Sequence, residues 1–349
     1  MAIGFYLVKG MNNLVLNCDA HDNYDGYSEG DSGNVDGFGG HANKETSTGN
    51  IFRGCRAWNN GDDGFDLINC YASYIIEYCW SFRNGYKPHS IESSGGNGAG
   101  FKSGGYGMGD IKKVPNPIPQ HTVRYCLAYY NRQQGFYSNH HLGGLIFENN
   151  TAYKNPSNYN MLNRKSSNEA VDVPGYGHII KNNLSLSPRN SGGFPQHLIN
   201  VDNTLSEIKN NSFAPNDLNL SESDFESLNE QELMGSRKSD GSLPDINFLR
   251  LTNHANFRFS GMGCFINEEA VDYSWIQEPA IVLENGVARI VGENSRSFNK
   301  FYVNGEEVSI ENGIVDLTSM SGELNLKAIS ENGAVTTPVS YTHLRAHET

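Results

Sequence analysis

Residues 51–60 read IFRGCRAWNN, and this order of residue types recurs through the first two-thirds of the chain. Each copy has a few β-forming residues, then Cys or Asn, a small residue, an aromatic residue and Asn. Aligning the copies stacks one column whose members are 24 to 47 positions apart: Cys18, Cys55, Cys79, Cys126, Asn150, Asn183 and Asn211. Short strands joined by turns of variable length explain a fixed core with an uneven period.

The repeat predicts an all-β protein built as a parallel β-helix, a solenoid whose coils stack at the strand spacing of about 4.8 Å. Equivalent side chains then lie above one another, so stacked Asn residues can hydrogen-bond from coil to coil. Small apolar Cys side chains can fill the interior. Because four of the six cysteines share one repeat position, we expect buried, reduced thiols. No spacing of Cys and His indicates a zinc site.

The composition of this 349-residue chain agrees with that fold class. It contains 38 Gly and 43 Asn, which favour turns, and 11% aromatic residues, which argues against disorder. The formal net charge of -13 disfavours a nucleic-acid-binding protein, which is normally basic. We expect no membrane span, because no stretch approaches the roughly 20 apolar residues that one needs.

Four regions are predicted along the chain. Residues 1–250 form the β-helix, for which we expect earlier coils to be missing, and residues 251–278 form a linker. Residues 279–338 alternate like strands joined by Asn-Gly or Gly turns, which predicts a small β-sandwich module that is cut short at its C-terminal end. Residues 339–349, VSYTHLRAHET, look like a translated sequencing adapter and are treated as a non-native tail.

The segment between the repeats and the sandwich has its own pattern. Residues 221–235 have helical spacing and a Ser cap, which predicts a helix. Residues 242–251 read as an extended tail that packs against an end of the solenoid.

Two acidic turns carry the strongest chemical signal. Residues 34–40 read NVDGFGG and residues 59–67 read NNGDDGFDL. If they occupy corresponding turns of neighbouring coils, four carboxylates converge: Asp36, Asp62, Asp63 and Asp66. Such a cluster persists only where a cation or protons offset the repulsion, and hard oxygen ligands in turns suit Ca²⁺. The alternative is that each Asp simply favours its turn.

Lys102 is a second candidate, within the glycine-rich residues 96–109, GNGAGFKSGGYGMG. Glycine there lets backbone and substrate approach closely. The alternative is a solvated Lys on a loop. The segment is not a phosphate-binding loop, because the order GxxxxGK[ST] is absent. Arg132, Tyr137, Asn139 and His140 follow Lys102 by about one coil, and we expect them to line a saccharide groove.

Taken together, four segments resemble the family-nine polysaccharide lyases, which include pectate lyases. They are GNIFRGCRAWNNGDDGFDLINC (49–70), WSFRNGY (80–86), GAGFKSGG (98–105) and HHLGGLIFENNTAYKN (140–155). The resemblance covers roughly residues 3–250. Relatives often read GFKLGG where this chain has GFKSGG, and residues 135–141, GFYSNHH, also depart from the family pattern. These departures concern substrate subsites more than the base or the metal.

The resemblance implies a right-handed β-helix with an asparagine ladder. It also implies that Asp36, Asp62, Asp63 and Asp66 ligate a catalytic Ca²⁺ and that Lys102 is the Brønsted base. The implied activity is β-elimination on pectate, an acidic plant cell-wall polysaccharide, giving 4,5-unsaturated oligouronides. Such a protein is expected to be a monomer that is secreted, periplasmic or on the cell surface.

Three alternatives stay open. A rhamnogalacturonan-type lyase would use the same chemistry on another backbone. A polygalacturonase-like hydrolase would use paired carboxylates, but its Gly-His-Gly and Arg-Ile-Lys elements are missing. A β-helical adhesin would use the acidic cluster for structural calcium only. Ultraviolet absorbance of an unsaturated product separates a lyase from the last two.

Overall fold

The computed structural model describes residues 3–27, 33–106, 114–189, 196–213, 215, 218–266, 280–284, 286–291, 298–311, 314–330, 336 and 339–343. The chain divides into two compact units, Met1–Ile266 and Asn267–Thr349. The first unit therefore extends beyond the boundary expected at residue 250, because residues up to Phe265 pack into its core. The expected linker over 251–278 is thus part of the first unit as far as Ile266, and its remainder lies outside the described residues.

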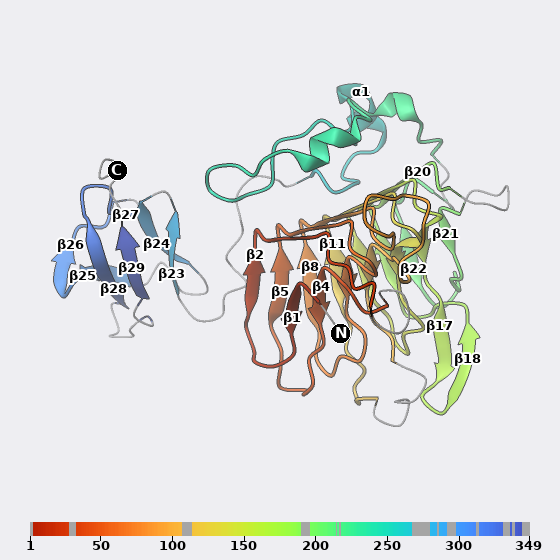
Figure 1. The fold of residues 1–349 in the computed structure, drawn as a ribbon, viewed down its shortest axis with the longest axis horizontal. Coiled ribbons are helices and arrows are strands. Elements are labelled where there is room, and N and C mark those ends of the chain that lie inside the picture. The colour runs from red at the N-terminus through yellow and green to blue at the C-terminus, as the bar shows by residue number, and fades with distance from the viewer. Residues whose placement is uncertain are drawn as a thin grey trace. The chain divides into compact units, whose positions relative to one another are not determined.

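The first unit is a parallel β-helix with three sheets along its length (Figure 1). Sheet A contains β1 (Phe5–Leu7), β4 (Phe38–Gly40), β7 (Phe65–Asp66), β10 (Phe101–Lys102), β13 (Gln134–Tyr137), β16 (Ser157–Asn160) and β21 (Leu198–Ile199). Sheet B contains β2 (Leu14–Leu16), β5 (Asn50–Arg53), β8 (Tyr74–Glu77), β11 (Thr122–Arg124), β14 (Ile146–Glu148), β19 (Ile179–Lys181) and β22 (Glu207–Lys209). Sheet C contains β3 (Asp19–His21), β6 (Arg56–Trp58), β9 (Trp80–Phe82), β12 (Leu127–Tyr129), β15 (Thr151–Tyr153) and β20 (Leu184–Leu186). The chain visits A, B and C in turn, so each coil adds one strand to each sheet, and the predicted right-handed β-helix is confirmed.

The interior of sheet A is a stack of aromatic rings. Its successive members lie 4.7 to 5.0 Å apart between ring centroids, with planes within 13° of parallel: Phe5, Phe38, Phe65, Phe101, Phe136 and Tyr159. Because side chains alternate between the two faces of a strand, the residue after each ring points outward. The stack therefore fixes the register of an outer row, which carries the chemistry.

Two polar ladders line the turns. In the predicted column, the backbone N–H of Cys126 donates to Asn150 Oδ1 at 3.0 Å, and Asn150 and Asn183 each donate onward to the next Asn at 2.9 Å. A second ladder of amide-to-amide bonds of 2.7 to 3.1 Å closes the turn after sheet C: Asn23, Asn60, Asn84, Asn131, Asn155 and Asn158. None of the six cysteines, all of which lie in the described residues, forms a disulfide, as expected, and five of them are buried.

The chain after residue 217 forms a strap along the outer face of sheet C (Figure 1). Leu233, Phe248 and Phe259 of the strap pack against Trp58 and Trp80. The expected tail therefore covers a flank of the solenoid and not its end, because sheet C presents large aromatic side chains outward. The strap also carries α1 (Asn253–Arg258).

The helix expected over residues 221–235 is only partly present. Two 3₁₀ turns form instead, η2 (Glu222–Asp224) and η3 (Glu230–Met234). The backbone N–H of Ser221 donates to Asp224 Oδ2 at 2.9 Å, so the cap exists. The helix stops because Phe225 bridges to Leu251 and is extended. Pairing within the strap outweighs the local helical preference.

The second unit contains two antiparallel sheets around their own core, in agreement with the predicted small β-sandwich. One sheet has β23 (Ala280–Glu284), β24 (Val287–Val291) and β27 (Ile314–Asp316). The other has β26 (Glu306–Val308), β25 (Phe298–Val303), β28 (Gly322–Ser330) and β29 (Val339–His343). Residues 339–343, expected to belong to the tail, thus pair as a strand, and residues 344–349 lie outside the described residues. In the described part of the chain, no helix has the length and apolar character to span a membrane.

Candidate functional site

Four successive strands of sheet A carry Gly-Phe in the same register, at 37–38, 64–65, 100–101 and 135–136. The glycine is required by space: a Cβ at Gly100 would lie 2.7 Å from both the Asn131 side chain and the Gly135 carbonyl oxygen. The residues before Gly-Phe form one column: Asp36, Asp63, Ala99 and Gln134. The residues after it form a second, outward-facing column: Gly39, Asp66, Lys102 and Tyr137.

Three of the four carboxylates that we expected to converge lie together. Oxygen atoms of Asp36, Asp63 and Asp66 all lie within 4.8 Å of one another, and all three residues are buried. Lys102 Nζ lies 3.0 Å from Asp66 Oδ2 and 3.1 Å from Asp63 Oδ2. The structure therefore brings Lys102 directly to the cluster, which we call the acidic cluster (Asp36, Asp63 and Asp66).

Backbone donors fix the orientation of each carboxylate. Asp36 Oδ1 accepts a bond from the Asp63 N–H at 3.0 Å, and Asp63 Oδ1 accepts one from the Ala99 N–H at 2.6 Å. Asp66 Oδ1 accepts a bond from the Ile68 N–H at 2.8 Å. Each carboxylate is thus held by the coils through one oxygen, and its second oxygen can face the centre of the cluster.

The charges in this cluster are unbalanced. Burial, and then repulsion from Asp66, Asp63 and Asp62, raises the pKa of Asp36 well above its usual value. Complete burial raises the pKa of Asp63 to about 7, against the opposing effect of Lys102. Burial alone would lower the pKa of Lys102, but the three surrounding carboxylates outweigh it and raise that pKa well above its usual value. One ammonium does not neutralise three buried carboxylates.

This arrangement fits a divalent cation. Among the described residues, the Lys102 ammonium is the only cation that the structure places against these oxygens, and it is divided between Asp63 Oδ2 and Asp66 Oδ2. Three buried carboxylates that share one ammonium are costly unless a further cation binds them. Carboxylate oxygens on short turns are the ligands that Ca²⁺ takes. Asp36, Asp63 and Asp66 are the residues that would hold it.

Asp62 is placed differently from the other three predicted ligands. Its Oδ2 accepts a bond from the Asn34 N–H at 2.6 Å, and its Oδ1 accepts bonds from the backbone N–H groups of Asn97 and Gly98. It lies beside the acidic cluster, close enough to raise the pKa of both Asp36 and Asp63. In this structure Asp62 orders the turns around the site.

The four residues expected in the saccharide groove divide into two pairs. Arg132 Nη1 donates to the Gly96 carbonyl at 2.8 Å, and Asn139 Nδ2 donates to the Gly104 carbonyl at 2.8 Å. Arg132 and Asn139 therefore anchor the glycine-rich loop, of which residues 107–109 lie outside the described residues. Tyr137 and His140 instead contact each other, with 2.9 Å between the tyrosine hydroxyl and Nε2.

Three residues that contact the site were not assigned to it from the sequence, namely Tyr6, His41 and Asp172. Tyr6 OH lies 3.1 Å from His41 Nδ1, and His41 Nε2 lies 3.9 Å from Asp66 Oδ1. Asp172 Oδ1 lies 2.6 Å from His140 Nδ1. The order Gly-Phe-Gly-Gly-His at 37–41 gave a signal for His41, because it places this residue just beyond the outer column. The sequence around Asp172 has no comparable signal.

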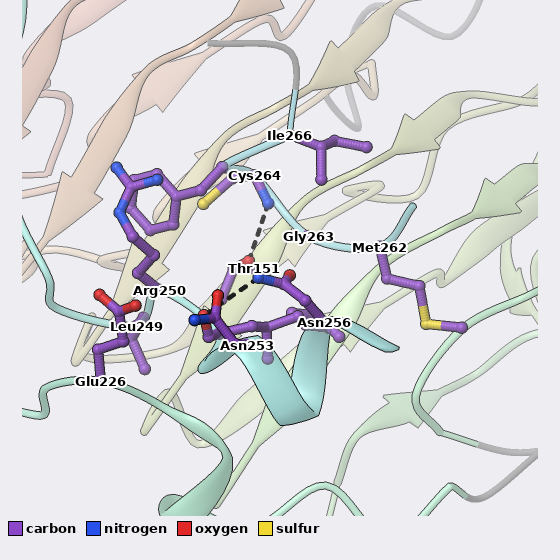
Figure 2. Close-up of a pocket in the computed structure, with 13 residues that line it drawn as sticks. Thr151, Glu226, Leu249, Arg250, Asn253, Asn256, Met262, Gly263, Cys264 and Ile266 are labelled. Carbon is purple, nitrogen blue, oxygen red and sulfur yellow. Dashed lines mark hydrogen bonds between the residues drawn. The ribbon is translucent and has the colours of Figure 1, made fainter. Parts of the chain in front are cut away.

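A separate pocket of about 210 Å³ lies between α1 and sheet C (Figure 2). Thr151, Leu249, Asn253, Met262 and Cys264 are among the side chains that line it. The backbone N–H of Cys264 donates to Thr151 Oγ1 at 3.0 Å, which fastens the strap to the coil. None of the acidic cluster lines this pocket, so we assign it no part in the chemistry.

Known proteins resemble this chain in both units. A family model described as "Pel9A-like, right handed beta helix region" matches residues 1–210, and one described as "Rhamnogalacturonan lyase-like, C-terminal" matches residues 202–337. Pectate lyase L of Dickeya chrysanthemi is 35% identical over 76% of this chain and 54% of its own length. Pectate lyase PEL9 of Emericella nidulans is 29% identical, over 70% of this chain and 57% of its own length.

Solved structures agree with these relatives. One described as "Rhamnogalacturonan lyase" has a TM-score of 0.70 and 56% identity, covering 76% of this chain and 63% of that one. The crystal structure of pectate lyase Pel9A has a TM-score of 0.56 and 34% identity, covering 72% of this chain and 55% of that one. This chain spans about half the length of the curated relatives that it matches.

Proposed function

Because the chain belongs to the Pel9A-like right-handed β-helix family of polysaccharide lyases, we propose that it cleaves an acidic pectic polysaccharide by calcium-dependent β-elimination. The observation that carries this proposal is the acidic cluster, in which three buried carboxylates face one lysine amine. A hydrolase would need two carboxylates set for acid and base, whereas here the carboxylates share one centre. An adhesin would not need Lys102 at that centre.

The elimination has clear physical requirements. The proton on carbon 5 of a uronate becomes removable only if the charge left behind is stabilised. When bound, Ca²⁺ would supply that stabilisation by drawing charge onto the substrate carboxylate. Asp36, Asp63 and Asp66 would hold the ion, and Asp62 would keep their turns in place.

Lys102 is the residue that we assign to accept the proton. It must be neutral to do so, yet the carboxylates around it raise its pKa well above the usual value, after the opposing effect of burial. Carboxylates that are committed to a divalent ion no longer stabilise the ammonium, so loading the site lowers the pKa of Lys102. Activity is therefore expected to need the metal and to rise toward alkaline pH.

The similarities favour one backbone over another. The structure described as a rhamnogalacturonan lyase is 56% identical to this chain, whereas pectate lyase L is 35% identical. The match of residues 202–337 to a rhamnogalacturonan lyase-like region points the same way. We propose rhamnogalacturonan as the first candidate and pectate, our expectation from the sequence, as the second. We further propose that the protein acts on this polymer outside the cytoplasm, as a secreted, periplasmic or cell-surface enzyme, and as a monomer.

The test is an assay of the purified chain on rhamnogalacturonan and on homogalacturonan, with Ca²⁺ or with a chelator. We expect ultraviolet absorbance from unsaturated ends only with Ca²⁺, and restoration when Ca²⁺ is returned. New reducing ends without that absorbance would indicate a hydrolase. Full activity in a chelator would remove the metal from the mechanism. The ratio of rates on the two polymers assigns the backbone.

A further inference from the structure

A hairpin insertion contacts the turn that follows β13 in sheet A. The strands β17 (Asn163–Ser166) and β18 (Glu169–Val173) follow β16 and extend beyond the coils (Figure 1). Asn163 bridges to His141, which ties the base of the hairpin to the turn after β13. Asp172 on β18 is thereby brought to His140 on that turn.

Three side chains form a continuous chain of contacts from this hairpin to sheet A. Asp172 Oδ1 lies 2.6 Å from His140 Nδ1, and His140 Nε2 lies 2.9 Å from the Tyr137 hydroxyl. The two rings are nearly perpendicular at 75°, so the imidazole edge meets the phenol oxygen. With Nδ1–H donated to Asp172, Nε2 of the neutral imidazole accepts the hydrogen bond from the Tyr137 hydroxyl and so fixes the position of the phenol oxygen.

Tyr137 is the neighbour of Lys102 in the outer column. Its Cα pairs with that of Lys102 across adjacent parallel strands, and Lys102 pairs on its other side with Asp66. Burial, with a contribution from Asp172, raises the pKa of Tyr137 to about 12, and Lys102 opposes this rise. The phenol is therefore protonated at neutral pH, and it lies within electrostatic reach of the amine.

We propose that Tyr137 is the general acid of the elimination, protonating the departing glycosidic oxygen, with His140 and Asp172 as positioning residues. The inference rests on the proposed function. Lys102 takes the proton from carbon 5, the carbon 4–carbon 5 double bond forms, and the bond from carbon 4 to oxygen breaks. That oxygen takes the Tyr137 hydroxyl proton, which turns away from His140 Nε2 to make the transfer. Transfer of a proton from the Lys102 ammonium to the phenolate then restores both groups.

The geometry favours this donor over its neighbours. Of the described residues in the outer column, Asp66 and Tyr137 flank Lys102, and an ionised carboxylate has no proton to give. The ammonium that forms on Lys102 stabilises the phenolate that forms beside it. Because one proton is gained and one is lost, the site does not accumulate charge during the step.

The test is Tyr137→Phe, assayed on the polymer and on a synthetic uronide with 4-nitrophenoxide at carbon 4, a group that leaves without a proton. We expect kcat on the polymer to fall about a hundredfold, in the range for a lost general acid. On the nitrophenyl substrate we expect rates within about threefold of the unchanged chain. Terbium luminescence should report unchanged metal affinity.

Asp172→Asn tests the positioning role, and Glu169→Gln on the same strand is the matched control. Glu169 pairs with Lys165, 2.7 Å away at the tip of the hairpin, and both side chains are about half exposed. For Asp172→Asn we expect kcat on the polymer to fall about tenfold, while the rate on the nitrophenyl substrate is retained, as for Tyr137→Phe. For Glu169→Gln we expect no loss on either substrate.

Each result decides between the explanations. Near-normal turnover of Tyr137→Phe on the polymer would overturn the assignment, and so would an equal loss on both substrates, which would make the tyrosine a binding or folding residue. If the unchanged chain forms no unsaturated product from any substrate, the proposed function itself fails, independently of Tyr137.

Discussion

Sheets A and B of the β-helix each stack charged side chains across neighbouring coils, and they do so to opposite effect. On sheet B, Glu77 lies between Arg53 and Arg124 in register, with Arg53 Nε 2.5 Å and Arg124 Nε 2.8 Å from its two oxygens. On sheet A, three carboxylates share one lysine. Both groups are largely buried, so burial alone does not distinguish structure from function. The sign of the excess charge does, because two guanidiniums share one carboxylate on sheet B, whereas three carboxylates share one ammonium on sheet A.

The difference has a physical reason. A buried charge is tolerated when partners satisfy its hydrogen bonds, and the two guanidiniums do this for both oxygens of Glu77. The acidic cluster has an excess of buried carboxylates over cations, because Asp63 and Asp66 divide one ammonium between them. A fold keeps such a group only where something else binds there. Substitutions in the acidic cluster of sheet A should therefore lower activity or metal binding, whereas substitutions in the charged group of sheet B should lower the stability of the fold.

Lys102→Ala should have the largest effect. We expect turnover to fall about a thousandfold, within the range for a lost general base, while the chain stays folded and still binds Ca²⁺. The measurement is the rate of unsaturated product, with circular dichroism and terbium luminescence as controls. Turnover near that of the unchanged chain would show that another residue is the base.

Glu77→Ala should damage the fold and leave the chemistry intact. Removing the carboxylate leaves two guanidiniums facing each other, and we expect the free energy of unfolding to fall by about 3 kcal/mol. Glu207→Ala is the matched control, because Glu207 pairs with Lys181 at the surface and should cost under about 1 kcal/mol. Urea unfolding measures both. Lost activity per folded molecule would contradict a purely structural role for Glu77.

In the absence of metal, Asp36→Asn should raise the free energy of unfolding, whereas Glu77→Ala should lower it. Burial and neighbouring carboxylates raise the pKa of Asp36, so its ionised form destabilises the fold at neutral pH. We expect the metal-free variant to be more stable by about 1 kcal/mol. The variant should also lose the gain of about 2.7 kcal/mol that Ca²⁺ gives at a hundred times its Kd. Thermal unfolding with and without Ca²⁺ tests both, and a fully retained calcium response would exclude Asp36 as a ligand.

His141 and His178 are buried polar side chains that are neutral in the folded protein, in contrast to the charged groups of sheets A and B. Burial lowers the pKa of His141 and of His178 to about 4, and the backbone N–H groups of Gly105 and Leu145 donate to their Nδ1 atoms. Between pH 6.5 and 4 the unfolded chain binds protons that the fold does not. The free energy of unfolding should therefore decrease as the pH is lowered through this range, by about 1.4 kcal/mol per pH unit for each histidine.

Urea unfolding at pH 7, 6 and 5 measures this slope, and His178→Gln should make it shallower. A slope unchanged by that substitution would assign the acid sensitivity to other groups.

The sequence predicted the solenoid and most of the site for one reason. In a β-helix, a residue's place in the repeat determines its place in the stack, so the order of residue types was enough to set Cys126 and Asn150 in one column. The same logic predicted that Asp36, Asp62, Asp63 and Asp66 converge, because Gly-Phe marks equivalent positions in successive coils, and the structure groups all of these but Asp62 in the acidic cluster. It also placed Tyr137 within about one coil of Lys102.

Tertiary structure alone decided what the insertions do. Three features depend on segments between the coils or on the backbone donors of those segments. They are the contact made by Asp172, the strap with its 3₁₀ turns, and the position of Asp62 outside the acidic cluster. The length and composition of such a segment do not say which face of the solenoid it covers. Repeat positions are set by the short-range stacking of each coil on the next, whereas an insertion is placed by contacts far away in the sequence. For that reason the repeats could be predicted from the sequence, and the contact of Asp172 with His140 could not.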